Sequence, residues 1–171
     1  TEGVFQLESS GMKQVLAGLQ PQNLEDVIAL ISLYRPGPMD SIPTYLRNRH
    51  EPDKISYKTP QLAHILDVTN GCIVYQEQVM QIFRELAGFS FGQADNVRRA
   101  MSKKKHAVME AEREHFVHGC TEPGHECPGC VANGISEKVA NEIYDEMSSF
   151  ASYAFNKSHA CLLYTSPSPR D

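Results

Sequence analysis

The sequence predicts a predominantly α-helical protein, and three observations support this fold class. Apolar residues recur at intervals of three and four over much of the chain, which is the spacing of amphipathic helices. Glycines, prolines and capping residues stand at the ends of these segments, where helices begin and end. The alternation of apolar and polar residues that marks strands is slight.

The first predicted helix is "NLEDVIALISLYR" (23–35). Its apolar face is formed by residues at i, i+3, i+4 and i+7, namely Leu24, Val27, Ile28 and Ile31. Asn23 suits the N-cap, and "RPGPM" (35–39) ends the helix because proline has no amide donor. We expect residues 40–58 to form a polar, irregular connection.

Residues 59–67, "TPQLAHILD", are predicted to form a short helix, and "TNG" (69–71) a turn. The segment 72–88 begins with a β-branched run and then takes a helical period. Gly88 is a natural C-terminal stop for that helix. A further helix begins at "SFGQ" (90–93), where serine and glutamine three residues apart form a capping-box pattern.

Two more helices are predicted at 106–119 and 136–151, separated by the Gly- and Pro-rich excursion "GCTEPGHECPGCVANG" (119–134). The excursion contains residues of the types that form a tetrahedral zinc site: Cys120, His125, Cys127 and Cys130. It has one CxxC pair, a weaker signal than two such pairs. The alternative interpretation is a surface loop that happens to be rich in cysteine.

The composition fits one domain, with 171 residues of which 41% are hydrophobic. No apolar run approaches the roughly 20 residues of a membrane span and no signal pattern begins the chain, so we expect a cytoplasmic protein. An odd number of cysteines without a secretion signal argues against a disulfide framework. The absence of an initiator methionine predicts that the chain is part of a longer protein.

The last residues, "CLLYTSPSPRD" (161–171), differ abruptly from the rest of the chain. The string matches the translation of a transposase-end adapter used in sequencing libraries. We therefore predict that residues 1–160 form the domain and that 161–171 are a non-native tail. The alternative is a natural linker rich in serine and proline.

A dense cluster of cations lies in "NVRRAMSKKKH" (96–106), although the formal net charge of the chain is −5. The cluster consists of Arg98, Arg99, Lys103, Lys104 and Lys105, and no carboxylate interrupts it. Both arginines turn away from the apolar stripe of their helix, so they point into solvent or at a ligand. Guanidinium groups donate bidentate hydrogen bonds to phosphate, which makes the cluster a candidate phosphate or nucleic-acid site. The alternative is that these cations only complement a helix dipole.

The segment "FASYAFNKSHA" (150–160) is a second candidate site. An aromatic ring that can stack on a base, Tyr153, stands close to a cation and several hydrogen-bonding groups: Asn156, Lys157, Ser158 and His159. The alternative for the histidine is a structural role. Two-metal phosphoryl transfer requires clustered carboxylates, and the chain has no D-x-D pair.

The chain resembles the alpha subunit of bacterial DNA polymerase III, the C-family of replicative polymerases, in its DnaE-type branch. Five motifs carry the resemblance, in the order and at the spacing of the family: "GVFQLES-GM", "IALISLYRPGPM", "YQEQVMQI", "GQADNVRRAMSKKK" and "FASYAFNKSHA". It covers residues 1–160 and implies a part of the fingers domain. Ser102 replaces a glycine of many relatives, and the excursion at 119–134 is not a general family feature.

The resemblance implies a DNA-directed DNA polymerase, a nucleotidyltransferase of DNA replication, whose fingers bind the incoming dNTP and primer–template DNA. Contacts with the dNTP are implied for Arg98, Arg99, Lys103, Tyr153 and 156–159, and contacts with DNA phosphates for Lys104 and Lys105. The palm aspartates that hold two Mg²⁺ ions in the family lie upstream of these motifs, so we expect this chain to be inactive alone.

Through the parent protein we also expect a sliding clamp, an exonuclease subunit and a clamp loader as partners, and no membrane. Two other classes stay open. One is a small nucleic-acid-binding module that contains zinc (Zn²⁺) and has no catalytic activity. The other is a helical protein–protein adaptor.

Overall fold

The computed structural model describes residues 7–103, 106–151 and 155–158. Within these ranges the chain is predominantly helical, as predicted, and its only β pairings are isolated bridges. The α-helices are α1 (Ser10–Leu19), α2 (Leu24–Leu33), α3 (Ile42–His50), α4 (Ala63–Leu66), α5 (Gln76–Ala87), α6 (Phe91–Ser102), α7 (His106–His118), α8 (Gly129–Ala132) and α9 (Glu137–Ala151). None of the helices in the described ranges is long and apolar enough to cross a membrane. The predicted tail at 161–171 lies outside the described residues.

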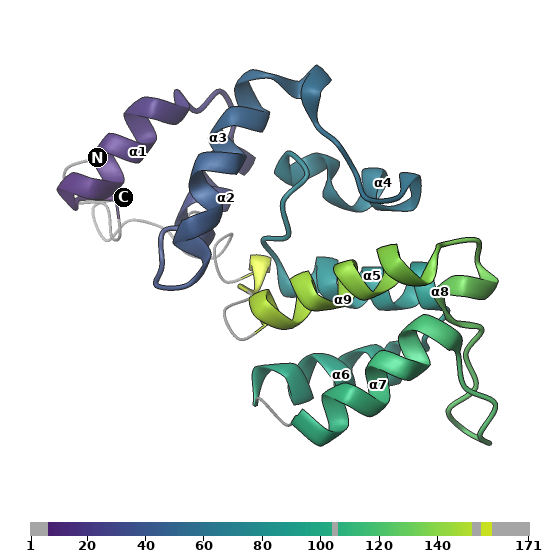
Figure 1. Cartoon of the computed structure of the whole chain (residues 1–171). Coiled ribbons are helices and arrows are strands. Elements are labelled where there is room, and N and C mark those ends of the chain that lie inside the picture. The colour runs from purple at the N-terminus through teal and green to yellow at the C-terminus, as the bar shows by residue number, and fades with distance from the viewer. Residues whose placement is uncertain (1–6, 104–105, 152–154, 159–171) are drawn as a thin grey trace.

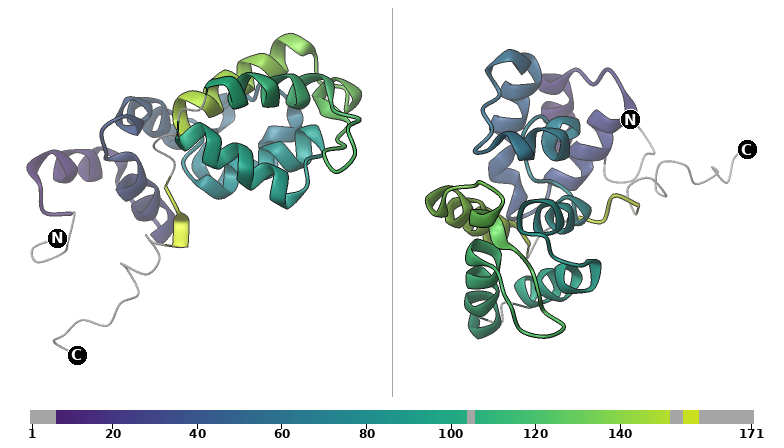
Figure 2. Two further views of the ribbon diagram at one scale, coloured as in Figure 1. Left: turned by 90° about the horizontal axis from the view of Figure 1, so that it is seen from below. Right: turned by 90° about the vertical axis from the view of Figure 1, so that its right-hand side faces the viewer.

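The buried apolar residues form two clusters, one on each side of the molecule. The first cluster joins α1, α2 and α3 with Cys72, Val74 and Tyr75. The second joins α4 to α9 and includes an aromatic group around Phe83. Figure 1 shows α1 to α3 at the upper left and α5 to α9 at the lower right. The segment 155–158 lies between the two groups of helices (Figure 2).

Local sequence signals define several helix ends as predicted. The side chain of Asn23 accepts a hydrogen bond from the Asp26 amide over 2.9 Å and caps α2. Gly88 adopts the left-handed conformation (φ +74°) after α5. The predicted turn at 69–71 is present, with Asn70 at φ 52°.

The prediction of an irregular connection at 40–58 is wrong. The segment contains α3, the end of the 3₁₀ turn η1 (Pro38–Ser41) and the 3₁₀ turn η2 (Pro52–Lys54). Pro43 lies in the first turn of α3, where its missing amide costs nothing. Ile42 and Tyr45 are buried against the first cluster. The basic residues in the last turn of α3 stabilise the helix because they lie at the negative end of its dipole.

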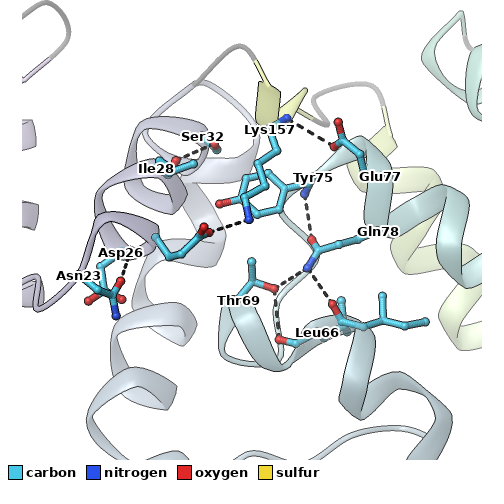
Figure 3. Close-up of polar contacts among 12 residues, drawn as sticks. Asn23, Asp26, Ile28, Ser32, Leu66, Thr69, Tyr75, Glu77, Gln78 and Lys157 are labelled. Atoms are coloured by element: carbon cyan, nitrogen blue, oxygen red, sulfur yellow. Dashed lines mark hydrogen bonds and ion pairs between the residues drawn. The ribbon is translucent and has the colours of Figure 1, made fainter. Parts of the chain in front are cut away.

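Gln78 fixes the segment where the two clusters meet. Its Oε1 accepts hydrogen bonds from the amides of Val74 and Tyr75, over 2.9 and 3.0 Å. Its Nε2 donates to the carbonyl of Ile65 and the hydroxyl of Thr69, over 3.1 and 2.7 Å (Figure 3). All four hydrogen-bonding positions of this buried amide are therefore used. Gln78 therefore fixes the extended backbone of Val74 and Tyr75, which directly precedes α5.

Candidate functional site

Helix α6 carries the two arginines of the basic cluster, and a capping box defines its start. The Ser90 amide donates to Gln93 Oε1 over 2.7 Å, and the Gln93 amide donates to the Ser90 hydroxyl over 3.3 Å. The apolar stripe predicted for this helix is buried in the second cluster: Ala94, Val97 and Met101. The arginines consequently lie on the flank and the outer side of α6.

Asp95 pairs with both arginines. Arg98 donates from Nε and Nη2 to Oδ1 of Asp95, over 3.1 and 2.7 Å, and from Nη1 to Gln76 Oε1 over 3.3 Å. Arg99 Nη2 lies 2.7 Å from Oδ2 of the same carboxylate. The Arg98 side chain is only 18% exposed, whereas that of Arg99 is 65% exposed. The hydrogen bond from Arg98, together with the charges of both arginines, holds the pKa of Asp95 below its usual value.

The basic cluster has no carboxylate within it in the sequence, but in the fold it has one beside it. Residues three and four positions apart share one face of a helix, so Asp95 reaches Arg98 and Arg99 directly. Asp95 therefore offsets part of the positive charge of the cluster within the protein itself. Sequence reasoning missed Asp95, although its spacing from the arginines is visible in the sequence.

A pocket of about 560 Å³ opens beside Arg98, between α5, α6 and the segment 155–158. Its charged lining groups are Arg84, Arg98, Glu77, Glu85 and Asp95. Asn156 also lines it, so the structure brings together one residue from each of two predicted motifs. Phe91, 65% exposed, offers an aromatic face to the same space. Sequence reasoning did not identify Phe91 or Arg84.

The segment 155–158 is docked onto the start of α5. Phe155 forms a parallel bridge with Tyr75, in which the Gln76 amide donates to the Phe155 carbonyl over 2.9 Å. The guanidinium of Arg35 lies 5.0 Å from the centre of the Phe155 ring. These contacts place the neighbouring Asn156 at the pocket.

Lys157 points away from the pocket lining. Its Nζ lies 2.8 Å from Glu25 Oε2, on α2, and 5.4 Å from the centre of the Tyr75 ring. Its amide donates to Glu77 over 3.4 Å (Figure 3). The ammonium group of Lys157 thus joins the segment 155–158 to the first cluster of helices.

Of the other residues predicted to contact a ligand, the structure describes two. Lys103 caps the C-terminus of α6 through its amide, and its side chain is exposed. Ser158 is exposed. Four more lie outside the described residues: Lys104, Lys105, Tyr153 and His159.

The four candidate zinc ligands are not assembled. Among the described residues, which include all four, no group of three or more His, Cys, Asp or Glu side chains could hold a metal ion. His125 is exposed, while Cys130 is fully buried in the second cluster. Burial raises the pKa of the Cys130 thiol to about 12. The described arrangement therefore does not bring these four side chains together as one ligand set.

Comparison with known proteins agrees with the resemblance in the motifs. Residues 1–124 match the family model of the bacterial DNA polymerase III alpha subunit finger domain. The chain is 48% identical over 160 residues to "DNA polymerase III subunit alpha" of Staphylococcus epidermidis. It is 49% identical over 160 residues to the protein of the same name from Staphylococcus aureus strain Mu50. These alignments cover 94% of this chain and 14% of each relative, so the chain spans a small part of their length.

Proposed function

The chain belongs to the family of the bacterial DNA polymerase III alpha subunit, as part of its finger domain, and on that premise we propose that it binds the incoming dNTP. The site is the pocket between α5, α6 and the segment 155–158. The observation that carries the proposal is that Arg98 and Asn156, distant in sequence, line one pocket. The parent protein would be a DNA-directed DNA polymerase that acts with the other subunits of the replicative holoenzyme, and would also hold primer–template DNA.

The arginines are equipped to stabilise a triphosphate. Within the described part of the chain, Asp95 and Gln76 use three of the five N–H donors of Arg98, which leaves two for phosphate oxygens. Asp95 and Gln76 fix the plane of the guanidinium before the ligand arrives, so little side-chain entropy is lost on binding. In this proposal Arg98 and Arg99 offset the charge that the triphosphate carries during in-line attack on its α-phosphate.

Mg²⁺ would supply the remaining charge compensation when bound, as in two-metal phosphoryl transfer. The chain lacks a D-x-D pair, and its described residues contain no carboxylate cluster for such ions. We therefore assign the Mg²⁺ ligands to the palm of the parent protein. The 171-residue chain alone is expected to show no polymerase activity.

Substitution of the arginines in the full-length parent polymerase tests the proposal. Arg98→Ala and Arg99→Ala should each raise the KM for the dNTP or lower kcat by well over twofold. Arg113→Ala is the matched control, because Arg113 on α7 pairs with Asp145 on α9 and does not line the pocket. If both kinetic constants stay within twofold in both arginine variants, the proposal is rejected.

A further inference from the structure

The cysteine-rich excursion has no part in the proposed nucleotide site, and its backbone brings two thiols together. Cys120 and Cys127 are paired in an antiparallel bridge. The backbone amide of each cysteine donates a hydrogen bond to the carbonyl oxygen of the other over 2.9 Å. In such a pair the Cα atoms are about 5.5 Å apart and both side chains lie on one face. A disulfide needs a Cα separation of about 4.4–6.8 Å, so the backbone already meets this requirement.

The base of this hairpin is held by close backbone packing. Gly119 and Gly129 adopt positive φ values of +89° and +79°. A Cβ atom on Gly129 would lie 2.3 Å from the Gly119 amide nitrogen, and one on Gly119 would lie 2.5 Å from the Pro128 carbonyl. Only glycine permits this approach at either position. The fold therefore sets the spacing of the two cysteines.

The two thiols share surroundings but differ in access. Cys127 is 8% exposed and belongs to the second cluster, and Cys120 packs against that cluster, so both side chains face the core. Cys120 is partly exposed and can be reached from solvent. The third cysteine of the excursion, Cys130, is completely buried.

We propose that Cys120 and Cys127 are a redox modification site, which forms a reversible disulfide across the base of the hairpin in exchange with a small-molecule disulfide such as oxidised glutathione. The Cys120 thiolate attacks one glutathione sulfur, which breaks the glutathione S–S bond and releases one glutathione thiolate. The Cys127 thiolate then attacks the Cys120 sulfur and expels the second glutathione. The protons of the two cysteines pass to the two glutathiones, and the two electrons lost by the cysteines reduce the glutathione disulfide.

The bond is expected to be easily reduced. Directly opposite, hydrogen-bonded residues keep their Cβ atoms toward about 5.5 Å, whereas a relaxed disulfide prefers about 3.8 Å. The bridge therefore draws the two strands together against their backbone hydrogen bonds. Strained or exposed disulfides are the labile ones, so excess reduced glutathione should open this bond.

Connectivity in the 171-residue chain tests the proposal. The chain is equilibrated in glutathione buffers from reduced to oxidised, with helicity checked by circular dichroism, then quenched in acid, alkylated and cleaved after Glu126. Cleavage there separates Cys120 from Cys127, so mass spectrometry should find the two peptides linked and 2 Da lighter than the free thiols. Fragmentation should assign the bond to Cys120 and Cys127. The link should vanish in excess reduced glutathione and in Cys120→Ser.

Two controls guard the assignment. Cys161→Ser removes a thiol outside the described residues and should leave the bond intact. Oxidation in denaturant should favour the nearest pair, Cys127 and Cys130, because it closes the shorter loop. The proposal is overturned if Cys120 and Cys127 remain free thiols in oxidised glutathione and are therefore alkylated after the quench. It is also overturned if Cys130 forms a disulfide with either of them in native buffer.

Discussion

Arg98 and Asp95 are joined by two hydrogen bonds to a single carboxylate oxygen, over 3.1 and 2.7 Å. The second oxygen of Asp95 pairs with Arg99 over 2.7 Å, so one carboxylate orders both guanidinium groups. The arginine pair therefore presents one net positive charge to a ligand and not two. Asp95 orients the arginines and at the same time limits their attraction for phosphate.

The substitution Asp95→Asn tests how far the charge of Asp95 weakens the attraction of the arginines for phosphate. The amide keeps the size of the side chain and one acceptor oxygen but removes the negative charge. In the parent polymerase we expect the KM for the dNTP to fall by about threefold at low ionic strength, with the effect fading as salt screens the charges. Asp145→Asn is the control, because Asp145 pairs with Arg113 away from the pocket. A KM for Asp95→Asn that equals the wild-type value at every salt concentration contradicts the prediction.

Phe91 allows a test of binding that is nearly free of folding effects. Its side chain is 65% exposed at the edge of the pocket, so Phe91→Ala should change the free energy of unfolding by less than about 0.5 kcal/mol. If the ring stacks on the nucleotide base, the KM should rise by about fivefold or more, since such stacking is worth roughly 1–3 kcal/mol. Val68→Ala, an exposed apolar residue outside the pocket, is the control. An unchanged KM would remove Phe91 from the site.

The elements that could be predicted from the sequence are those with local signals. Asn23 caps α2 and Ser90 caps α6 through side chains that contact amides three residues away. Helix α3 could not be predicted in this way, because its stability depends on burial of Ile42 and Tyr45 against distant helices. Helix α1 was not recognised either, although Ser9 caps it, because its two glycines weaken the helical pattern.

The residues of the candidate site also fall into two groups, those with a local sequence signal and those whose contacts depend on packing. The sequence indicated Arg98 through its charge and Asn156 through its motif. It did not indicate that Gln76 would order Arg98 or that Lys157 would turn toward Glu25. The first contact depends on the packing of α5 against α6, and the second on how Phe155 docks beside Tyr75. Pairing of distant segments is a property of the packed fold that no local pattern encodes.

Asp26 should make the stability of the chain sensitive to acid. Its carboxylate is buried, and burial raises its pKa. Hydrogen bonds from Arg49 and the Gln22 amide outweigh this effect and hold the pKa below its usual value. A carboxyl group whose pKa is lower in the folded state stabilises the fold above its unfolded pKa of about 3.9. That stabilisation is lost as pH falls through the folded value.

The measurement is urea unfolding of wild type and Asp26→Asn between pH 7 and pH 3. At pH 7 the variant should be less stable by about 1–3 kcal/mol, because Arg49 loses its charged partner. The difference should begin to narrow as pH drops below about 4, where Asp26 becomes protonated in the unfolded wild-type chain, and it should shrink further as pH falls through the lower pKa of the folded state. Asp53→Asn, at an exposed position, is the control and should follow the wild type. A difference that stays constant over this pH range contradicts the assignment.

Gln78 should be among the most costly positions to replace in the described part of the chain. In Gln78→Leu the amides of Val74 and Tyr75 and the carbonyl of Ile65 lose their partner inside the core. Each buried polar group left unsatisfied costs about 1–3 kcal/mol, so we expect a loss of roughly 3–5 kcal/mol in urea unfolding. Gln81→Leu lies one turn later on α5 and breaks only an exposed hydrogen bond to Glu85, so it should cost less than about 0.5 kcal/mol.

The same substitution should also undock the segment 155–158. Gln78 holds the extended residues before α5, and the Gln76 amide there donates to Phe155. Amide hydrogen exchange at Gln76 should therefore be slow in the wild type and in Gln81→Leu but fast in Gln78→Leu, at denaturant concentrations where all three chains are folded. Equal protection of this amide in the three chains would show that Gln78 stabilises the core without positioning the site. Fast exchange confined to Gln78→Leu would link the buried amide to the placement of Asn156.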